Sequence, residues 1–135
     1  MNSPRMPWWR RWFGRRSERH AEQFLRKKGF RILTRNWSCP LGELDLIARQ
    51  GNVLVFVEVR STSHETAESA IESVNPSKQR QLSRLALAFM KQYRLFDVTA
   101  RFDVVVLAWP AEAKQPVIQH FENAFESTIS RSMMG

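Results

Sequence analysis

The sequence predicts an α/β domain with a mixed central sheet flanked by helices, and three observations lead to this class. Its 135 residues suit one domain, because domains typically contain about 100–150 residues. Helical and extended patterns follow one another as a helix, three strands, a second helix and two further strands. The third strand pattern is apolar on both faces, which is typical of a central strand covered on both sides.

The first half of the domain is predicted to be a helix followed by three strands. The helix covers residues 15–28, where apolar residues recur at helical spacing and Gly29 provides a stop. The Gln50-Gly51 pair predicts a two-residue hairpin turn between the second and third strands. The three strands are predicted at residues 30–37, 42–49 and 52–60.

The second half is predicted to supply a second helix and two more strands. Residues 61–74 are polar and are expected to form a loop or a short helix. Asn75-Pro76 is a good N-cap and first-turn pair for the helix that follows. Strands are then predicted at 98–107 and 116–121, which completes five strands for one sheet.

Domain boundaries and compartment follow from composition. We expect residues 1–13 to be a flexible basic and aromatic arm, residues 14–125 to be the folded domain, and residues 126–135 to be a frayed tail. One cysteine excludes an intramolecular disulfide, and with three scattered histidines it cannot form a structural zinc site. Apolar runs are too short for a membrane span or a secretory signal, so a cytoplasmic location is expected.

Positive charge is concentrated in the first third of the chain. Residues 1–35 contain 11 basic and two acidic residues, whereas residues 36–135 contain 10 basic and 11 acidic ones. This distribution favours a polyanionic partner, nucleic acid in the first place, with a solubilising tail as the alternative. The aromatic side chains of the N-terminal arm are expected either to stack on unpaired bases of a nucleic acid or to fold back onto the domain. The residues expected to bind nucleic acid are Arg10, Arg11, Arg15, Arg16, Lys27, Lys28, Arg35, Trp8 and Trp12.

Acidic residues gather on the hairpin formed by the second and third strands. Glu43 and Asp45 share one face of their strand, and Glu58 and Arg60 share one face of theirs, because strand side chains alternate. With a Gln50-Gly51 turn, Glu43 lies opposite Glu58, and Asp45 lies diagonal to Glu58. Three carboxylates on one surface need a positive partner, since like charges repel and an unpaired buried charge is costly.

Arg60 and a divalent cation are the candidates for that partner. Carboxylate ligands with open positions suit Mg²⁺ or Mn²⁺, whereas the alternative is a solvated acidic face paired with surface arginines. Glu18 lies beside the apolar stripe of the first helix, and Lys78 lies on the core-facing stripe of the second. Each has an ordinary explanation as well, a surface ion pair for Glu18 and a snorkelling side chain for Lys78.

Six segments of the chain, from about Gly14 to Phe125, resemble the YraN-like family of small, largely uncharacterised bacterial proteins. The most specific is GELDLIA followed by FVEVR, and the others are GRRSERHAEQFL, GFRILTRNW, NPSKQRQL, RFDVVVL and HFENAF. That family resembles the PD-(D/E)xK nucleases, close to archaeal Holliday-junction resolvases. The resemblance implies a restriction-endonuclease-like αβββαβ core. Phe102 and Asp103 match family positions of unclear role.

The resemblance also implies metal-dependent cleavage of a phosphodiester, with DNA, including branched or structured DNA, as the expected substrate. It places Asp45 and Glu58 on Mg²⁺ or Mn²⁺, with the Val59 carbonyl as a third ligand and Glu18 as a helix acid. In that mechanism Arg60 or Lys78 stabilises charge on the phosphate. Either Glu43 or Glu18 orients the water or a second metal. Junction-cutting relatives are dimers, so the resemblance leaves a homodimer open.

Two departures from the superfamily pattern keep other hypotheses open. Arg60 stands where the superfamily has lysine, and arginine keeps the charge but cannot lose a proton to act as a base. Residues 61–74 lack the glycine and the second basic residue expected after the strand. A module that binds nucleic acid without cutting it is therefore the second hypothesis. Attachment of WWRRWFGRR to a membrane surface is the third and least expected, because the segment is short.

Overall fold

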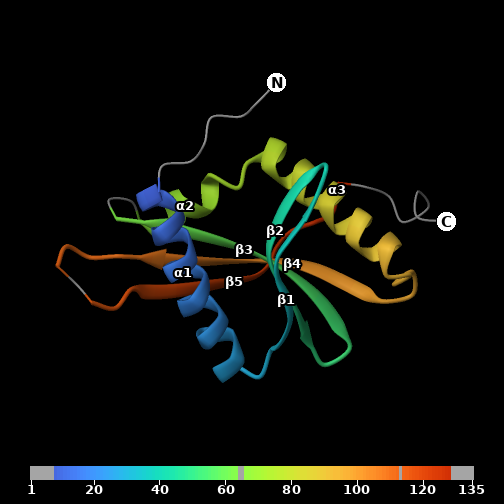
Figure 1. Cartoon of the computed structure of the whole chain (residues 1–135), viewed down its shortest axis with the longest axis horizontal. Helices are drawn as coiled ribbons and strands as arrows, with labels where there is room; N and C mark the ends of the chain where they lie inside the picture. Colours follow the sequence, from blue (N-terminus) through green and yellow to red (C-terminus); the bar gives the residue numbers. More distant parts are fainter. Residues whose placement is uncertain (1–7, 64–65, 113, 129–135) are drawn as a thin grey trace.

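A computed structural model gives the structure of residues 8–63, 66–112 and 114–128, with side chains described from residue 15 onward (Figure 1). Five strands and three helices follow in the order αβββααββ. The predicted α/β class with helices flanking a mixed sheet is therefore confirmed. The elements are α1 (Trp8–Lys27), β1 (Arg31–Cys39), β2 (Gly42–Gln50), β3 (Val53–Thr62), α2 (Ala67–Glu72), α3 (Pro76–Gln92), β4 (Thr99–Ala108) and β5 (Val117–Phe125).

The strands lie in the sheet in sequence order, β1-β2-β3-β4-β5. Neighbouring strands are antiparallel except β3 and β4, which are parallel. A parallel pair needs a crossover connection, and α2 with α3 provides it. This crossover brings the start of α3 back to the edge of the sheet where β3 ends.

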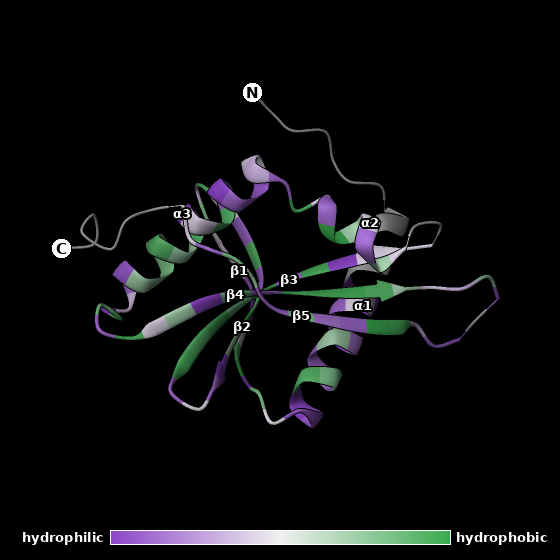
Figure 2. Cartoon of the chain, turned by 180° about the vertical axis from the view of Figure 1, so that it is seen from behind, coloured by the Kyte–Doolittle hydropathy of each residue, from purple (hydrophilic) through white to green (hydrophobic). Residues whose placement is uncertain are grey.

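Helices cover both faces of the sheet, so β3 is buried on both sides as its sequence predicted. Ala21 and Leu25 of α1 pack with Val57 on one face. Leu85 and Phe89 of α3 pack on the opposite face, with Leu54, Phe56 and Val104. Figure 2 shows apolar stretches along β3 and β4 between the helices. These two hydrophobic cores hold α1 and α3 on opposite faces of β3.

The register of the β2–β3 hairpin differs from the predicted one. Gln50 pairs with Val53, so the turn is Gly51-Asn52 and not Gln50-Gly51. Gly51 has φ 59°, and a two-residue turn of this kind takes glycine at its first central position. The prediction that Glu43 lies opposite Glu58 is therefore wrong. Leu46 with Val57 is the last pair at this end of the hairpin, and Asp45 and Glu58 are the residues that follow it on the two strands.

Several element boundaries also differ from the sequence pattern. The backbone of α1 begins at Trp8, so residues 8–13 of the expected arm are helical, while residues 1–7 lie outside the described residues. β5 runs to Phe125 because a register shift with β4, with Asn123 at φ 49°, carries it beyond residue 121. None of the helices described is long and apolar enough to cross a membrane.

Candidate active site

The candidate site lies where β2 begins and β3 ends, just beyond the last paired residues of these strands. The Asp45 carboxylate takes the place of a backbone partner there, because its Oδ2 accepts a hydrogen bond from the Val59 N–H at 2.8 Å. This bond fixes Asp45 against β3 beside Glu58. Glu58 itself is a buried charged residue, only 8% exposed, on the face of β3 that α3 covers.

Two cations approach Glu58 from different elements. The Arg60 Nε lies 3.6 Å from Glu58 Oε1, and the Lys78 Nζ lies 3.8 Å from the same oxygen. Lys78 reaches it because α3 starts here, with the Asn75 side chain accepting a hydrogen bond from the Lys78 N–H at 2.9 Å. The lysine on the core-facing stripe of α3 thus faces a buried carboxylate.

Two further acids join the site through Asn36, a residue that the sequence reading did not single out. Its amide nitrogen, assigned to face the carboxylates, donates to Glu18 Oε2 at 3.0 Å and to Glu43 Oε1 at 3.0 Å. Asn36 adopts φ 53°, a left-handed conformation that asparagine tolerates better than most residues. The kink turns its side chain toward the acids and links α1, β1 and β2 at one point.

Hydrogen bonds of the buried Ser17 hold α1 in place for Glu18. Ser17 is only 1% exposed, and its hydroxyl donates to the Ser61 Oγ at 2.9 Å. The Trp109 Nε1 donates in turn to the Ser17 Oγ at 3.2 Å. Because Ser17 is anchored to the ends of β3 and β4, the adjacent Glu18 is directed at the site. Small hydroxyl residues give no pattern in the sequence that would have revealed this contact.

The carboxyl groups of the site share more negative charge than the nearby cations neutralise. Burial, and then the charge of Asp45, raises the pKa of Glu58 to about 7. Burial and the same neighbour raise the pKa of Glu18 to about 7 as well. The pKa of Asp45 is also raised, mainly by burial, although the hydrogen bond from Val59 and the charge of Lys78 oppose the shift. The folded chain therefore keeps these acids close together at an energetic cost.

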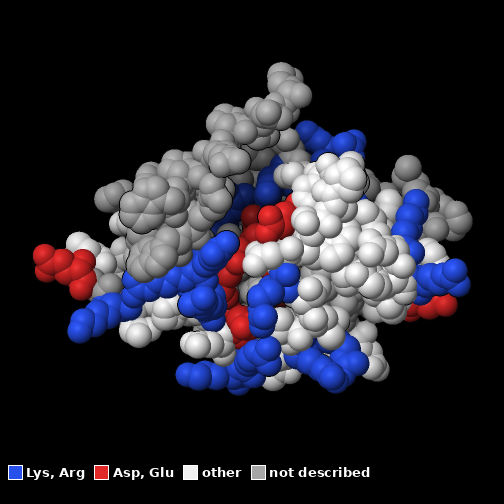
Figure 3. All heavy atoms as spheres, in the orientation of Figure 1, with Lys and Arg blue, Asp and Glu red and all other residues white. Residues whose placement is uncertain are grey.

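Figure 3 shows the same arrangement on the surface. Acidic side chains form a strip in a hollow across the middle of this face, and lysine and arginine side chains border it on several sides. The acidic residues in the hollow could bind a cation, and the lysine and arginine side chains around it could bind the negative charges of a polyanionic substrate.

The donor set fits a small divalent cation that keeps part of its water shell. In the part of the chain that the structure describes, no three His, Cys, Asp or Glu side chains gather closely enough to hold a metal ion by themselves. Mg²⁺ characteristically uses only one or two protein carboxylates together with waters and substrate phosphates. Asp45 and Glu58, with the Val59 carbonyl, are therefore the residues that would hold it. Their pKa values are raised mainly by burial, and a bound cation would favour the ionised forms of both acids.

Arg60 has donor capacity left over. Its Nε is buried and has no hydrogen-bond partner among the described residues, since 3.6 Å to Glu58 is too long for a hydrogen bond. A buried, unsatisfied donor is costly and usually has a function. A phosphate oxygen placed beside Glu58 would satisfy it.

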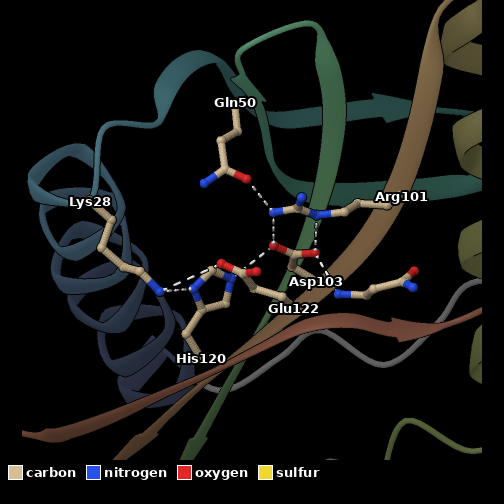
Figure 4. Close-up of polar contacts among 7 residues, drawn as sticks. Lys28, Gln50, Arg101, Asp103, His120 and Glu122 are labelled. Carbon is tan, nitrogen blue, oxygen red and sulfur yellow. Dashed lines mark hydrogen bonds and ion pairs between the residues drawn. The ribbon is translucent and has the colours of Figure 1, made fainter.

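A second polar cluster, which the sequence reading did not find, surrounds Asp103 (Figure 4). Asp103 is fully buried and accepts hydrogen bonds from Arg101 Nε at 2.9 Å and from the Asn123 N–H at 3.0 Å. His120 Nε2 lies 2.8 Å from Asp103 Oδ2, and Lys28 Nζ lies 2.8 Å from the other ring nitrogen. Burial alone would raise the pKa of Asp103, but these bonds hold it below its ordinary value.

This Asp103 cluster is structural. It ties the end of α1 to β4 and to the irregular part of β5, and it belongs to the core on the α1 face. It explains why an aspartate stands in the RFDVVVL segment, whose role the sequence left open.

The residues expected to bind nucleic acid fall into three groups. Some already have partners within the chain, since Lys28 contacts His120, Arg35 pairs with Glu22, and Arg16 donates to the Lys114 carbonyl at 3.0 Å. Arg15 and Lys27 are exposed on α1. The side chains outside the described part of the chain are those of Trp8, Arg10, Arg11 and Trp12.

Fold and site together define an α/β protein with a cluster of acids around the buried Glu58, beside two cations at one end of its sheet. The chain belongs to the uncharacterised protein family UPF0102, whose family model matches residues 17–107. This confirms the YraN-like resemblance. The match includes all six residues expected to be catalytic, from Glu18 to Lys78.

Relatives in the family match nearly the whole chain. A UPF0102 protein of Pelotomaculum thermopropionicum is 43% identical over 116 residues, which cover 86% of this chain and 97% of the relative. A UPF0102 protein of Stutzerimonas stutzeri is 44% identical over 115 residues, covering 84% and 94% of the two chains. A longer relative in Rhodopirellula baltica is 37% identical over 125 residues, covering 90% and 75%.

Proposed function

We propose that this protein hydrolyses phosphodiester bonds of nucleic acid, with DNA as the substrate and Mg²⁺ or Mn²⁺ as the cofactor. One observation carries the proposal: the half-buried carboxyl of Asp45 and the buried carboxyl of Glu58 lie beside an Arg60 Nε that has no hydrogen-bond partner in the described structure. Acids with too few cations call for a metal ion, and an unsatisfied guanidinium calls for an anion. A metal-bound phosphodiester supplies both.

Each residue of the site has a role in this chemistry. A cation held by Asp45, Glu58 and the Val59 carbonyl supplies Lewis-acid polarisation of the phosphoryl oxygen and lowers the pKa of a bound water. Arg60 donates to the phosphate oxygen and stabilises the charge that develops there, and it does so without any proton transfer of its own. Lys78 adds a second positive charge from α3 and favours the ionised form of Glu58, which metal binding requires.

Glu18 is placed to handle the proton of the attacking water. Its pKa of about 7 means that near neutral pH it is part protonated and part free to accept a proton, which is the range that suits a general base. The water oxygen bonds to phosphorus, one of its protons passes to Glu18, and the bond from phosphorus to the sugar oxygen breaks, with that oxygen taking a proton from solvent water to leave as an alcohol. Glu43, held with Glu18 through Asn36, orients the water.

A binding module that does not cut is the second candidate, and one observation favours it. Arg60 and Lys78 both approach the same Oε1 atom of Glu58, so the protein partly neutralises this acid without a metal. Such a site would hold nucleic acid through its basic borders alone. Membrane attachment gains no support from the described residues.

The test is cleavage of end-labelled single-stranded, duplex, flapped and four-way-junction DNA, and of RNA, with Mg²⁺ or Mn²⁺. We expect the parent to cut DNA and Asp45→Asn to lose about 100-fold or more, because removing a transition-state electrostatic group costs about that much. Asp97→Asn removes an exposed carboxylate beyond α3 and serves as the matched control. Binding without cleavage by every metal-loaded sample would support the second candidate.

A further inference from the structure

A pocket of about 220 Å³ lies beside the candidate site, on the outer surface of the molecule. Its walls are the tip of the β1–β2 hairpin and the first half of α3, which lie next to each other in Figure 1. The residues that line it are Leu41, Ser77, Arg80, Gln81 and Arg84. None of them belongs to the set expected from the sequence to bind nucleic acid.

Close packing at Gly42 fixes the two walls of the pocket relative to each other. A Cβ atom at this position would come within 3.0 Å of the Gln81 Nε2 and 3.6 Å of a Leu85 methyl group. Gly42 also has φ 141°, which other residues rarely adopt. The hairpin tip is therefore seated directly on α3, and the pocket is a built feature of the fold.

The pocket is strongly basic. The helix Pro76–Gln92 contains four basic residues and no acidic one. Arg80 and Arg84 have no ion pair among the residues that the structure describes. Both are exposed, and they lie one turn apart on the same face of α3. Two guanidiniums that have no ion-pair partner in the described part of the chain, both at one hollow, are suited to bind phosphate groups.

We propose that this pocket binds the phosphodiester backbone of a nucleic acid strand that continues into the candidate active site. Arg80 and Arg84 each hold a phosphate, with Ser77 and Gln81 as further hydrogen-bond donors. Leu41, which is 56% exposed at the hairpin tip, provides an apolar contact for the sugar or base between them. Lys78 connects the pocket to the site, because it follows Ser77 in α3 and contacts Glu58.

The spacing of the two arginines agrees with a single strand of backbone. Residues one turn apart are separated by about 6 Å along a helix axis. Phosphates of one strand are about 3.4 Å apart along the axis of duplex DNA, so the two arginines fit phosphates within two or three nucleotides. The pocket thus accounts for the position of a strand on the α3 side of the site.

This inference rests on the proposed function for its ligand, but binding can be measured without cleavage. Fluorescence anisotropy of labelled single-stranded and flapped DNA in EDTA gives the affinity as a function of salt. The double variant Arg80→Gln/Arg84→Gln keeps good helix formers in α3. We expect the slope of log affinity against log salt to fall by about 1.4–1.8, since each lost phosphate contact removes about 0.7–0.9.

Two controls separate charge in the pocket from charge in general. Arg49→Gln/Arg94→Asn removes the same charge at the opposite end of the sheet, and asparagine tolerates the φ of 54° at position 94. This control should leave the slope nearly unchanged. Leu41→Ser should weaken binding and leave the slope as it is, because it removes an apolar contact and no charge.

The outcomes distinguish the two proposals. If Arg80→Gln/Arg84→Gln has the affinity and slope of the parent, or if the distal control lowers the slope as much, the pocket is not a backbone site. If the slope falls as expected but no metal-loaded sample cuts DNA, the hydrolytic function is wrong while the pocket stands. A parent that binds no nucleic acid in EDTA overturns the pocket proposal directly.

Discussion

Replacing Glu58 by glutamine should stabilise the protein above neutral pH, which is unusual for a buried residue. Glu58 is 8% exposed, and burial together with Asp45 raises its pKa from 4.5 to about 7. The folded chain therefore binds this proton more tightly than the unfolded chain does. The stability that this carboxyl contributes is fully present below pH 4.5 and is lost as the pH rises to about 7, where the folded carboxyl ionises.

The size of the effect follows from the same shift. A pKa raised from 4.5 to about 7 corresponds to roughly 3 kcal/mol, at about 1.4 kcal/mol per pKa unit. Glutamine keeps the shape and cannot ionise, so Glu58→Gln should recover much of this free energy at pH values above 7. For a domain of this size that is a rise in Tm of roughly 10 °C.

The assay is urea unfolding in EDTA at a series of pH values from below 4.5 to above 7. We expect parent and Glu58→Gln to be similar at the acid end and to diverge as pH rises, with the variant more stable. Some pH dependence remains in the variant, because the pKa of Glu18 is also raised. Glu126→Gln, which changes an exposed carboxyl, is the control. A Glu58→Gln variant that is less stable than the parent above pH 7 would refute the reasoning.

Three further predictions test other parts of the account. Mn²⁺ should raise the Tm of the parent above pH 7, because it binds only the folded chain, and it should leave the Tm of Asp45→Asn unchanged in a thermal melt. Arg60→Lys should keep or raise any nuclease activity, whereas Arg60→Ala should abolish it. If Arg60→Ala cuts DNA as well as the parent, Arg60 only neutralises the nearby acids. The activity of Lys78→Ala should then be measured, since Lys78 could stabilise the phosphate instead. Asp103→Asn should lower the free energy of unfolding by about 3 kcal/mol at neutral pH, since it removes the buried charge with which the half-buried Arg101 pairs. The pKa of Asp103 is held below its ordinary value of 3.8, so the stability that this residue contributes should persist down to that pH and be lost only in stronger acid. An Asp103→Asn variant with the same urea midpoint as the parent would contradict the structural role of Asp103.

The general fold and the membership of the site could be predicted from the sequence because both depend on periodicity. Strand alternation put Asp45 and Glu58 on facing strands, and helical spacing put Lys78 on the buried stripe of its helix. The register of β2 against β3 depends on which residue occupies the first position of the turn between them. The sequence predicted a Gln50-Gly51 turn, whereas the left-handed φ of Gly51 places this glycine at the first position of a Gly51-Asn52 turn.

Other features could not be predicted because they depend on tertiary contacts. Asn36 reaches Glu18 and Glu43 only because β1 is kinked at that residue. Asp103 and His120 meet across two strands whose pairing shifts register. The basic face of α3 is hidden in the composition, because acidic residues elsewhere in the second part of the chain cancel its charge.

The central claim is that Asp45 and Glu58 hold a divalent cation, and a crystal soaked in Mn²⁺ tests it most directly. Anomalous scattering locates manganese without reference to activity or to any substrate. The account predicts a manganese peak bonded to the Asp45 and Glu58 carboxylates, with the Val59 carbonyl or water completing the shell, and no such peak in Asp45→Asn crystals. A fully soaked parent crystal with no manganese at these two carboxylates would contradict the account.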